Sequence, residues 1–189
     1  MRYSLAIALL LTVFHVFGQS NYRVSGYNMV IKGTSNLHDW ESSVKEVRAN
    51  GTLLTDASGL NAIQSLYVEV PVRSIKSSKG SIMDGKTYDA LRSGDHPNIT
   101  YKLERVSGIN KKSGGFDLNA SGYLTIAGTT NKIDLYVQGR IGGDGGITFS
   151  GSKKLKMTDY KVKPPTALLG TLTTGDDVEI VFQVTLKQG

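Results

Sequence analysis

The 189-residue sequence contains no cysteine. Disulfide bonds, cysteine nucleophiles and cysteine-ligated metal sites are therefore excluded, and the fold depends on its own core packing. The Gly-x-Ser-x-Gly motif of many hydrolases is also absent, so no serine stands out as a nucleophile. No apolar run after residue 17 is long enough to span a bilayer. Nothing in the sequence gives a positive reason to predict an enzyme, and no cofactor is predicted.

The first 18 residues have the composition of a signal peptide. Arg2 precedes a nearly continuous apolar run from Leu5 to Phe17, and the small residue Gly18 lies where cleavage is expected. The run is short for a bilayer span, although a retained membrane anchor is the alternative. We therefore expect a signal peptide over residues 1–18 and a single domain over residues 19–189. The protein is predicted to be exported, either to the periplasm or as a secreted protein.

Basic residues outnumber acidic ones, with 22 Lys and Arg against 16 Asp and Glu. Small clusters occur at Lys111–Lys112 and at Lys153–Lys156. Such clusters favour contact with anionic surfaces such as membranes, but they are also typical of solvated strand faces, which we expect here. No aromatic platform accompanies them, which argues against nucleic-acid binding. Peripheral contact with a membrane and pairing into a homodimer stay open.

The clearest structural signal is the alternation between Phe116 and Arg140. Apolar residues occupy every second position from Phe116 to Ile126 and again from Ile133 to Val137. Side chains two apart along a strand share a face, so the pattern predicts an antiparallel hairpin that is dry on one side. The interruption at residues 127–131 contains Gly and Asn, which supply the backbone angles of a tight turn.

Similar alternation predicts strands over residues 28–34, 41–54, 66–72, 147–157 and 178–186, and another from residue 99 onward. Residues 79–93 break the pattern and predict a short helix whose apolar side carries Ile82, Met83, Tyr88 and Leu91. Eight antiparallel strands at hairpin spacing are typical of a sandwich or a barrel. The inward-facing sets are almost free of charge, which favours the barrel, and a closed eight-stranded barrel can hold one small ligand.

Four motifs in this order resemble those of the YceI-like family. They are Leu37–Trp40, similar to a variant in exported members; Val70–Ile75, similar to an I-P-V-x-S-I strand end; Met83–Leu91 with His96–Tyr101, similar to a short helix followed by P-x-I-x-F; and Gly122–Asn131, similar to a G-x-L-T-I-x-G hairpin. The resemblance covers nearly the whole chain after residue 18. It implies an all-β fold, an eight-stranded antiparallel lipocalin-like barrel with a short helical insert. It also implies binding of isoprenoids or other amphiphilic lipids.

The leading hypothesis is a binding or carrier protein that holds a long apolar lipid, such as a polyisoprenoid, inside the barrel. The side chains expected to line the ligand site are Val68, Val70, Ile99, Tyr101, Leu124, Ile126, Leu135, Phe149, Ile180 and Phe182. The alternative is a filled barrel that acts without ligand as a structural or interaction protein of the cell envelope. A void no larger than one water would favour this alternative.

Two further predictions concern the turns. His38 and His96 each adjoin an aspartate, Asp39 and Asp95, which raises the hypothesis of a metal-dependent hydrolase. Both histidines are also ordinary turn residues, and we expect no metal site. Trp40 carries a large apolar ring with one N–H donor. We expect it to plug one end of the barrel, with His38 as a hydrogen-bonding turn residue beside it.

Overall fold

A computed structural model describes residues 18–56, 59–167 and 170–189 of the protein. Within these ranges eleven strands form one sheet. The strands are β1 (Gly18–Ser35), β2 (Trp40–Val44), β3 (Arg48–Asp56), β4 (Gly59–Pro71), β5 (Ile75–Ser77), β6 (Asn98–Lys112), β7 (Gly115–Ile126), β8 (Thr129–Ile141), β9 (Ile147–Lys156), β10 (Thr166–Ala167) and β11 (Leu172–Gln188). The helix α1 spans Ser81–Ala90, and the 3-10 turns η1 and η2 span Val72–Ser74 and Thr158–Tyr160. Apart from Gly18, the predicted signal peptide lies outside the described residues.

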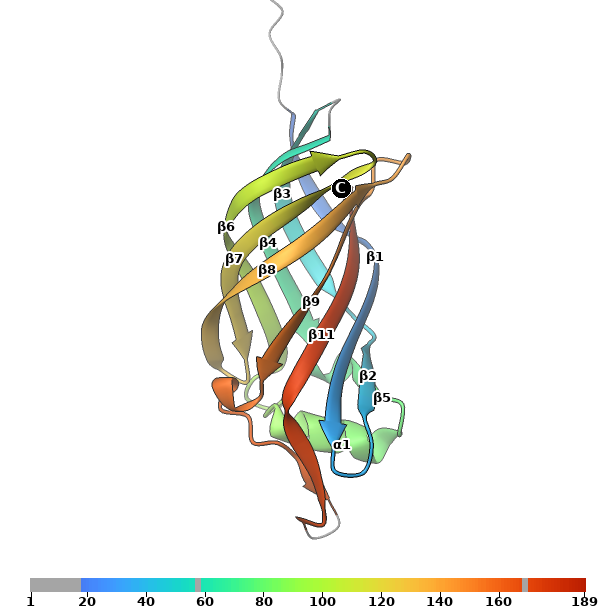
Figure 1. The fold of residues 1–189 in the computed structure, drawn as a ribbon, viewed down its shortest axis with the longest axis vertical. Coiled ribbons are helices and arrows are strands. Elements are labelled where there is room, and N and C mark those ends of the chain that lie inside the picture. Colours follow the sequence, from blue (N-terminus) through green and yellow to red (C-terminus); the bar gives the residue numbers. More distant parts are fainter. Residues whose placement is uncertain (1–17, 57–58, 168–169) are drawn as a thin grey trace, which may run out of the picture.

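Eight strands close into a barrel. Their order is β11, β9, β8, β7, β6, β4, β3 and β1, and β1 then pairs antiparallel with β11 to complete the ring. The short strands β2 and β5 extend the sheet from the lower part of β1, and β10 pairs with β11. Figure 1 shows the tilted strands, with α1 below the lower end and the C terminus at the upper end. The predicted all-β barrel with a helical insert is confirmed.

The hairpin of β7 and β8 follows the predicted alternation. Its inward-facing residues from Phe116 to Ile126 are buried, and those between them are more exposed except for Ser121, which is buried as well. The turn is tighter than predicted, because Ile126 pairs directly with Thr129 and only two residues connect the strands. Ala127 and Gly128 both have positive φ, 48° and 80°, as a two-residue turn matched to the strand twist requires.

Two irregularities shape the strands that precede this hairpin. The predicted strand over residues 41–54 is divided at residues 45–47 into β2 and β3. The first strand is longer than predicted, since β1 begins at Gly18 rather than near Asn28. A bulge between Val24 and Gly26 shifts the register against β11. The bulge moves the inward-facing positions from even to odd residue numbers, so one regular alternation cannot describe the whole strand.

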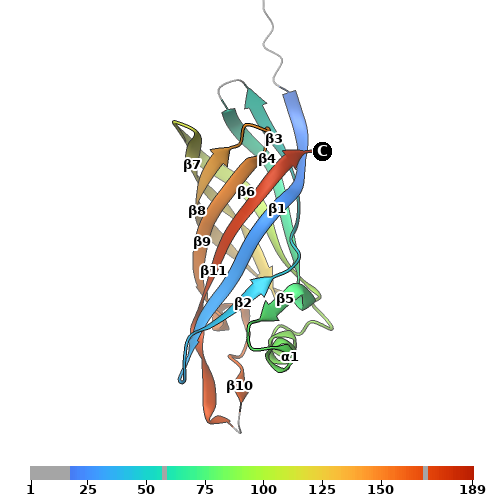
Figure 2. The ribbon, with the colours of Figure 1, turned by 90° about the vertical axis from the view of Figure 1, so that its right-hand side faces the viewer.

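The upper end of the barrel is filled by large apolar side chains. Those almost fully buried there are Tyr22, Leu53, Leu60, Phe116, Ile147 and Leu186. The rings of Phe116 and Phe149 meet edge to face with centroids 5.8 Å apart, a favoured arrangement of aromatic pairs. Phe116 also lies against Gly139 on β8, where any Cβ would overlap its ring. These buried side chains fill the end of the barrel that lies opposite α1, and Figure 2 shows the two ends of the strands.

The helix α1 lies across the lower end. Met83 and Leu91 face the barrel as predicted, but Ile82 is 79% exposed, so its prediction as part of the apolar side is wrong. The residues that face the barrel are Met83, Thr87, Ala90 and Leu91, which follow helical spacing and leave Ile82 off that stripe. None of the helices in the described ranges is long and apolar enough to cross a membrane.

Candidate functional site

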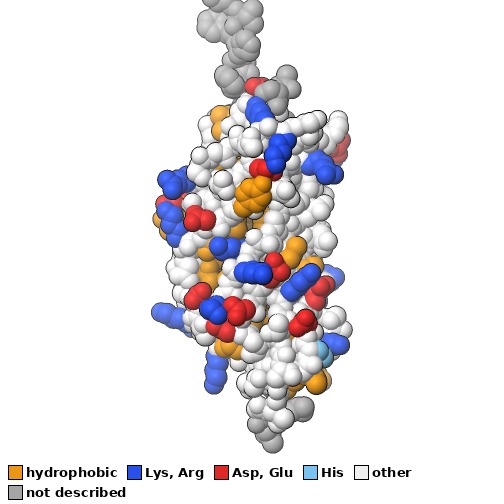
Figure 3. Space-filling model, in the orientation of Figure 1, with side chains coloured by type: hydrophobic (Ala, Val, Ile, Leu, Met, Phe, Trp, Pro, Cys, Tyr) orange, Lys and Arg blue, Asp and Glu red, His pale blue; other side chains and the backbone are white. Residues whose placement is uncertain are grey.

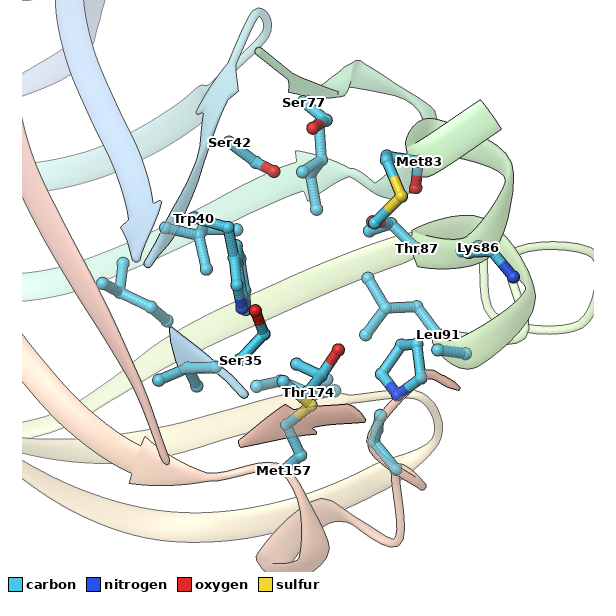
Figure 4. Close-up of a pocket in the computed structure, with 18 of the residues that line it drawn as sticks. Ser35, Trp40, Ser42, Ser77, Met83, Lys86, Thr87, Leu91, Met157 and Thr174 are labelled. Carbon is cyan, nitrogen blue, oxygen red and sulfur yellow. The ribbon is translucent and has the colours of Figure 1, made fainter. Parts of the chain in front are cut away.

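A cavity of about 340 Å³ lies between α1 and the lower end of the barrel. We call it the lower chamber. Figure 4 shows its opposing walls, with Met83, Thr87 and Leu91 projecting from α1 toward Trp40 and Met157. Further apolar lining comes from β1, from β9 and the segment after it, and from β11, with smaller contributions from β5, β6 and β7. It includes Ile31, Leu155, Tyr160, Val162, Leu172 and Val178. Its volume lies at the low end of the range of small-molecule pockets.

A second cavity of about 160 Å³ lies inside the ring of strands above the first. We call it the upper chamber. Its lining is apolar except for two side chains, Tyr101 and Lys153. Ile99 and Ile180 line both chambers. The two chambers therefore meet at these isoleucines, and together they follow the axis of the barrel.

All ten side chains predicted to line the ligand site lie on these walls. Nine line the upper chamber: Val68, Val70, Ile99, Tyr101, Leu124, Leu135, Phe149, Ile180 and Phe182. Ile126 lines the lower chamber. Their contact with a ligand stays a prediction. The lining also includes Trp40, Met83 and Met157, which were not predicted. They come from a loop edge, a helix and a strand end that converge only in the folded chain.

The size of the chambers contradicts the alternative hypothesis of a filled barrel. A single water needs only about 10–15 Å³ of such volume, whereas the described barrel encloses chambers of about 340 and 160 Å³. The interior is therefore packed at its upper end and hollow below.

Polar contacts hold α1 in place over the lower chamber. The Tyr88 hydroxyl lies 2.9 Å from the carbonyl oxygen of Arg73 and accepts a hydrogen bond from Lys76 Nζ at 2.6 Å, which raises the pKa of Lys76. Asp84, only 8% exposed, accepts the Ser77 amide at 2.7 Å. Lys86 Nζ reaches across the opening to the carbonyl oxygen of Thr166 at 3.1 Å. These contacts hold α1 over the opening of the lower chamber, and we call the helix the lid.

The rim of the lower chamber is more polar than its interior. Ser35, His38, Lys79 and Lys86 lie among its lining residues. The backbone carbonyl of His38 accepts hydrogen bonds from the amide and the hydroxyl of Ser35, at 3.1 and 2.7 Å, which confirms His38 as a turn residue. A polar rim over an apolar interior suits a ligand with a long apolar part.

Trp40 is part of this wall. Its ring lies against Gly33, and its indole N–H donates to the carbonyl oxygen of Thr34 at 2.9 Å. The predicted position at one end of the barrel and the predicted donor are confirmed. The prediction of a plug is wrong, because Trp40 is only half-buried and borders an open chamber. The closed end is the opposite one, around Phe116.

The two histidines lie in different surroundings. His38 borders the lower chamber, whereas the imidazole of His96 lies against Gly128 in the turn between β7 and β8. Over the ranges that the structure describes, no three His, Asp or Glu side chains gather as metal ligands would. The described residues therefore give no support to the hypothesis of a metal-dependent hydrolase.

The lysine cluster at residues 153–156 divides between the two faces of β9. Lys154 and Lys156 point to solvent, and Lys156 pairs with Asp177 at 3.1 Å, as expected of a solvated strand face. Lys153 instead lines the upper chamber. Figure 3 shows that basic and acidic side chains are interspersed on this side of the molecule. The expectation of a solvated face is therefore wrong for Lys153.

Comparisons with known proteins agree with this architecture. A family model described as YceI-like domain matches residues 18–186. A polyisoprenoid-binding domain from Saccharophagus degradans, implicated in plant cell wall breakdown, is similar in structure with a TM-score of 0.67 at 11% identity, covering 91% of this chain and 100% of that one. BcnA from Burkholderia cenocepacia has a TM-score of 0.66 at 20% identity, covering 84% and 95%. The Campylobacter jejuni YceI protein has a TM-score of 0.51 at 18% identity, covering 100% and 99%. No curated protein matches the chain.

Proposed function

This chain belongs to the YceI-like family, and on that premise we propose that it is a non-enzymatic carrier of a long apolar lipid such as a polyisoprenoid. The observation that carries the proposal is the pair of apolar chambers that meet at Ile99 and Ile180. The polyisoprenoid-binding domain of Saccharophagus degradans, which shares the fold, supports this class of ligand.

The physical basis of binding is burial of hydrocarbon. Each methylene moved from water into an apolar environment gains about 0.8 kcal/mol. Ordering the chain and losing its free motion cost a large part of this gain. A few isoprene units are nevertheless enough for an affinity near the micromolar level.

The lower end is proposed to be the route by which lipid enters. Leu37, 71% exposed, and Ile82, 79% exposed, project from the β1–β2 loop and from α1, both beside the lower chamber. Lys79 and Lys86 lie on its rim. Exposed apolar side chains flanked by lysines suit transient contact with an anionic bilayer surface. A carrier that is exported, as the N-terminal sequence predicts, would collect its lipid there.

The decisive experiment is mass analysis of lipid extracted from the protein after gentle purification. The matched variants are Ile180→Trp, which fills the junction of the chambers, and Gln183→Trp, which places the same ring on the outer face of β11. We expect lipid in the wild type and in Gln183→Trp. We expect Ile180→Trp to lose it while keeping its cooperative unfolding.

The proposal is wrong if the wild-type protein is free of lipid and also gives no response to added geranylgeraniol in a titration of Trp40 fluorescence. Equal lipid content in Ile180→Trp and the wild type would show that lipid binds elsewhere on the molecule.

A further inference from the structure

Lys153 interrupts an otherwise uncharged row inside the barrel. The inward-facing positions of β9 are Ile147, Phe149, Gly151, Lys153 and Leu155, and they pair with the inward-facing Leu186, Val184, Phe182, Ile180 and Val178 of β11. Paired residues on neighbouring antiparallel strands share a face. Lys153 therefore faces the interior opposite Ile180, one of the two side chains that border both chambers.

The ammonium group of Lys153 lies where β8 and β9 separate. Their pairing ends at Val137 and Gly151, and no residues below these are paired between the two strands in the described chain. Figure 1 shows the two strands diverging there. Lys153 Nζ spans the gap and donates to the backbone carbonyl of Asp134 at 3.0 Å. An ammonium has three donors, so this contact leaves further donors for another acceptor.

Lys153 has no counter-ion among the described residues. In the part of the chain that the structure describes, no carboxylate lies within ion-pair distance of its Nζ, in contrast to Lys156 with Asp177. The nearby Asp134 carboxylate accepts the Ser121 hydroxyl at 2.5 Å instead. Lys153 is half-buried and its contact with Asp134 is exposed to solvent, but its side chain also borders an apolar space, where a charge gains from a charged partner. The site therefore fits a negative charge brought by a ligand.

Tyr101 provides a second donor in the same chamber. Its hydroxyl is buried and has no hydrogen-bond partner within the described residues. The ring extends over Gly122, where an added Cβ would come within 2.5 Å of the hydroxyl oxygen. Burial raises the pKa of Tyr101 to about 12, and the negative charge of Asp134 contributes as well. The hydroxyl is thus protonated. It lies over Gly122 on β7, whose partner on β8 is Ile133, the residue before the Asp134 that Lys153 contacts.

We propose that Lys153 and Tyr101 form a subsite for the carboxylate of a fatty-acid-type amphiphile at the junction of the two chambers. Two donors and one positive charge match two oxygens that share one negative charge. A phosphate head would leave excess negative charge in an apolar space, and a pure hydrocarbon would leave both donors unpaired. The inference rests on the proposed function and narrows its ligand class.

The test compares oleic acid with methyl oleate by isothermal titration calorimetry, below the critical micelle concentration. The two probes share their chain and differ in the head. We expect the wild type to bind oleate about tenfold more tightly, the usual scale of one charge-assisted hydrogen bond. Equal affinities for the two probes would overturn the proposal without any variant.

Variants test which side chains cause the preference for oleate over methyl oleate. Lys153→Met, which keeps the length of the side chain, should abolish the tenfold difference between oleate and methyl oleate. Lys153→Arg should retain the preference, and so should Lys154→Met on the solvent face. Tyr101→Phe should weaken oleate by about threefold. A preference that survives in Lys153→Met would place the carboxylate elsewhere and refute the assignment.

A second pair of probes, geranylgeraniol and geranylgeranyl phosphate, separates this inference from the function on which it rests. Binding of geranylgeraniol and methyl oleate without a preference for oleate refutes only the subsite. A Lys153-dependent preference for the phosphate without one for oleate refutes the carboxylate. Failure of all four probes to bind refutes the lipid-carrier function itself.

Discussion

The two ends of this barrel are built from the same strands but differ in how their interiors are packed. At the upper end β1 pairs with both β3 and β11, and the space inside is filled by side chains such as Leu53 and Phe116. At the lower end β8 and β9 separate, and α1 covers a hollow of about 340 Å³. The difference shows how a small barrel combines a stable fold with access to its interior. Buried apolar side chains stabilise the upper end, whereas polar contacts hold α1 over the lower end.

The largest expected effect comes from emptying the packed end. Phe116→Ala removes a ring that is 3% exposed and that contacts Phe149 and Gly139. We expect the free energy of unfolding to fall by about 3–5 kcal/mol, the usual cost of such a cavity. Urea denaturation followed by circular dichroism measures it. The control Leu37→Ala, exposed at the opposite end, should change stability by less than about 0.5 kcal/mol.

Truncating the aromatic side chain at the open end should cost less. Trp40→Ala removes a half-buried ring and one hydrogen bond to Thr34, so we expect a loss of about 2 kcal/mol. The same urea experiment decides the comparison. A loss equal to that of Phe116→Ala would mean that the lower end is as tightly packed as the upper one.

Tyr101 lies between the two ends and gives an effect that depends on pH. Its pKa is raised from 10.0 to about 12 by burial, so the folded state holds this proton more tightly than the unfolded state. The resulting stabilisation is complete below about pH 10 and is lost as the pH rises toward about 12. Discounted for partial exposure, it amounts to about 1–2 kcal/mol.

Tyr101→Phe isolates this effect from other groups that titrate in alkali. The variant should lose stability less steeply between about pH 10 and 12. At neutral pH it should be more stable than the wild type by up to about 1 kcal/mol, because the ligand-free protein no longer buries an unpaired hydroxyl. Parallel alkaline profiles for the two proteins would contradict the assignment.

The smallest effect concerns the lid. Tyr88→Phe removes the hydroxyl that Lys76 and the carbonyl of Arg73 share, worth about 1 kcal/mol locally. We expect α1 amides to exchange hydrogen about fivefold faster, with bound lipid released faster to a similar degree. Tyr67→Phe, on the outer face of β4, is the control and should leave both rates unchanged. Equal exchange in both variants would show that α1 is held by other contacts.

The fold was predictable where a local pattern carries it. The two strands of the hairpin at Phe116–Val137 alternate regularly on either side of the turn, so their inward-facing residues follow from the sequence alone. The first half of β1 was missed because the bulge after Val24 reverses the alternation. Ile82 was misplaced because apolar character does not say which side of a ten-residue helix meets the barrel. That choice is made by contacts distant in sequence.

The candidate site, like the fold, was predictable only where a local pattern determines which side chains face inward. The ten predicted lining residues lie on strands, where the alternation determines which side faces inward. Lys153 could have been assigned from that rule as well, since it is in phase with Phe149 and Leu155. Its charge made a solvent-facing position seem natural. The cavity itself could not be predicted from the sequence. Whether inward-facing side chains fill a barrel depends on the diameter of the barrel and on the segment that covers its end.

The pairing of β1 with β11 also has a kinetic consequence. These strands join residues about as far apart as the chain allows, for instance Arg23 with Lys187. Contacts between such distant residues raise the contact order, and proteins dominated by them fold slowly. A nascent chain cannot close the ring until β11 has been synthesised, so its first strand waits with one edge unpaired. The last step of folding is then the joining of the two ends of the chain, and any factor that shields β1 until that moment would raise the yield of folded protein.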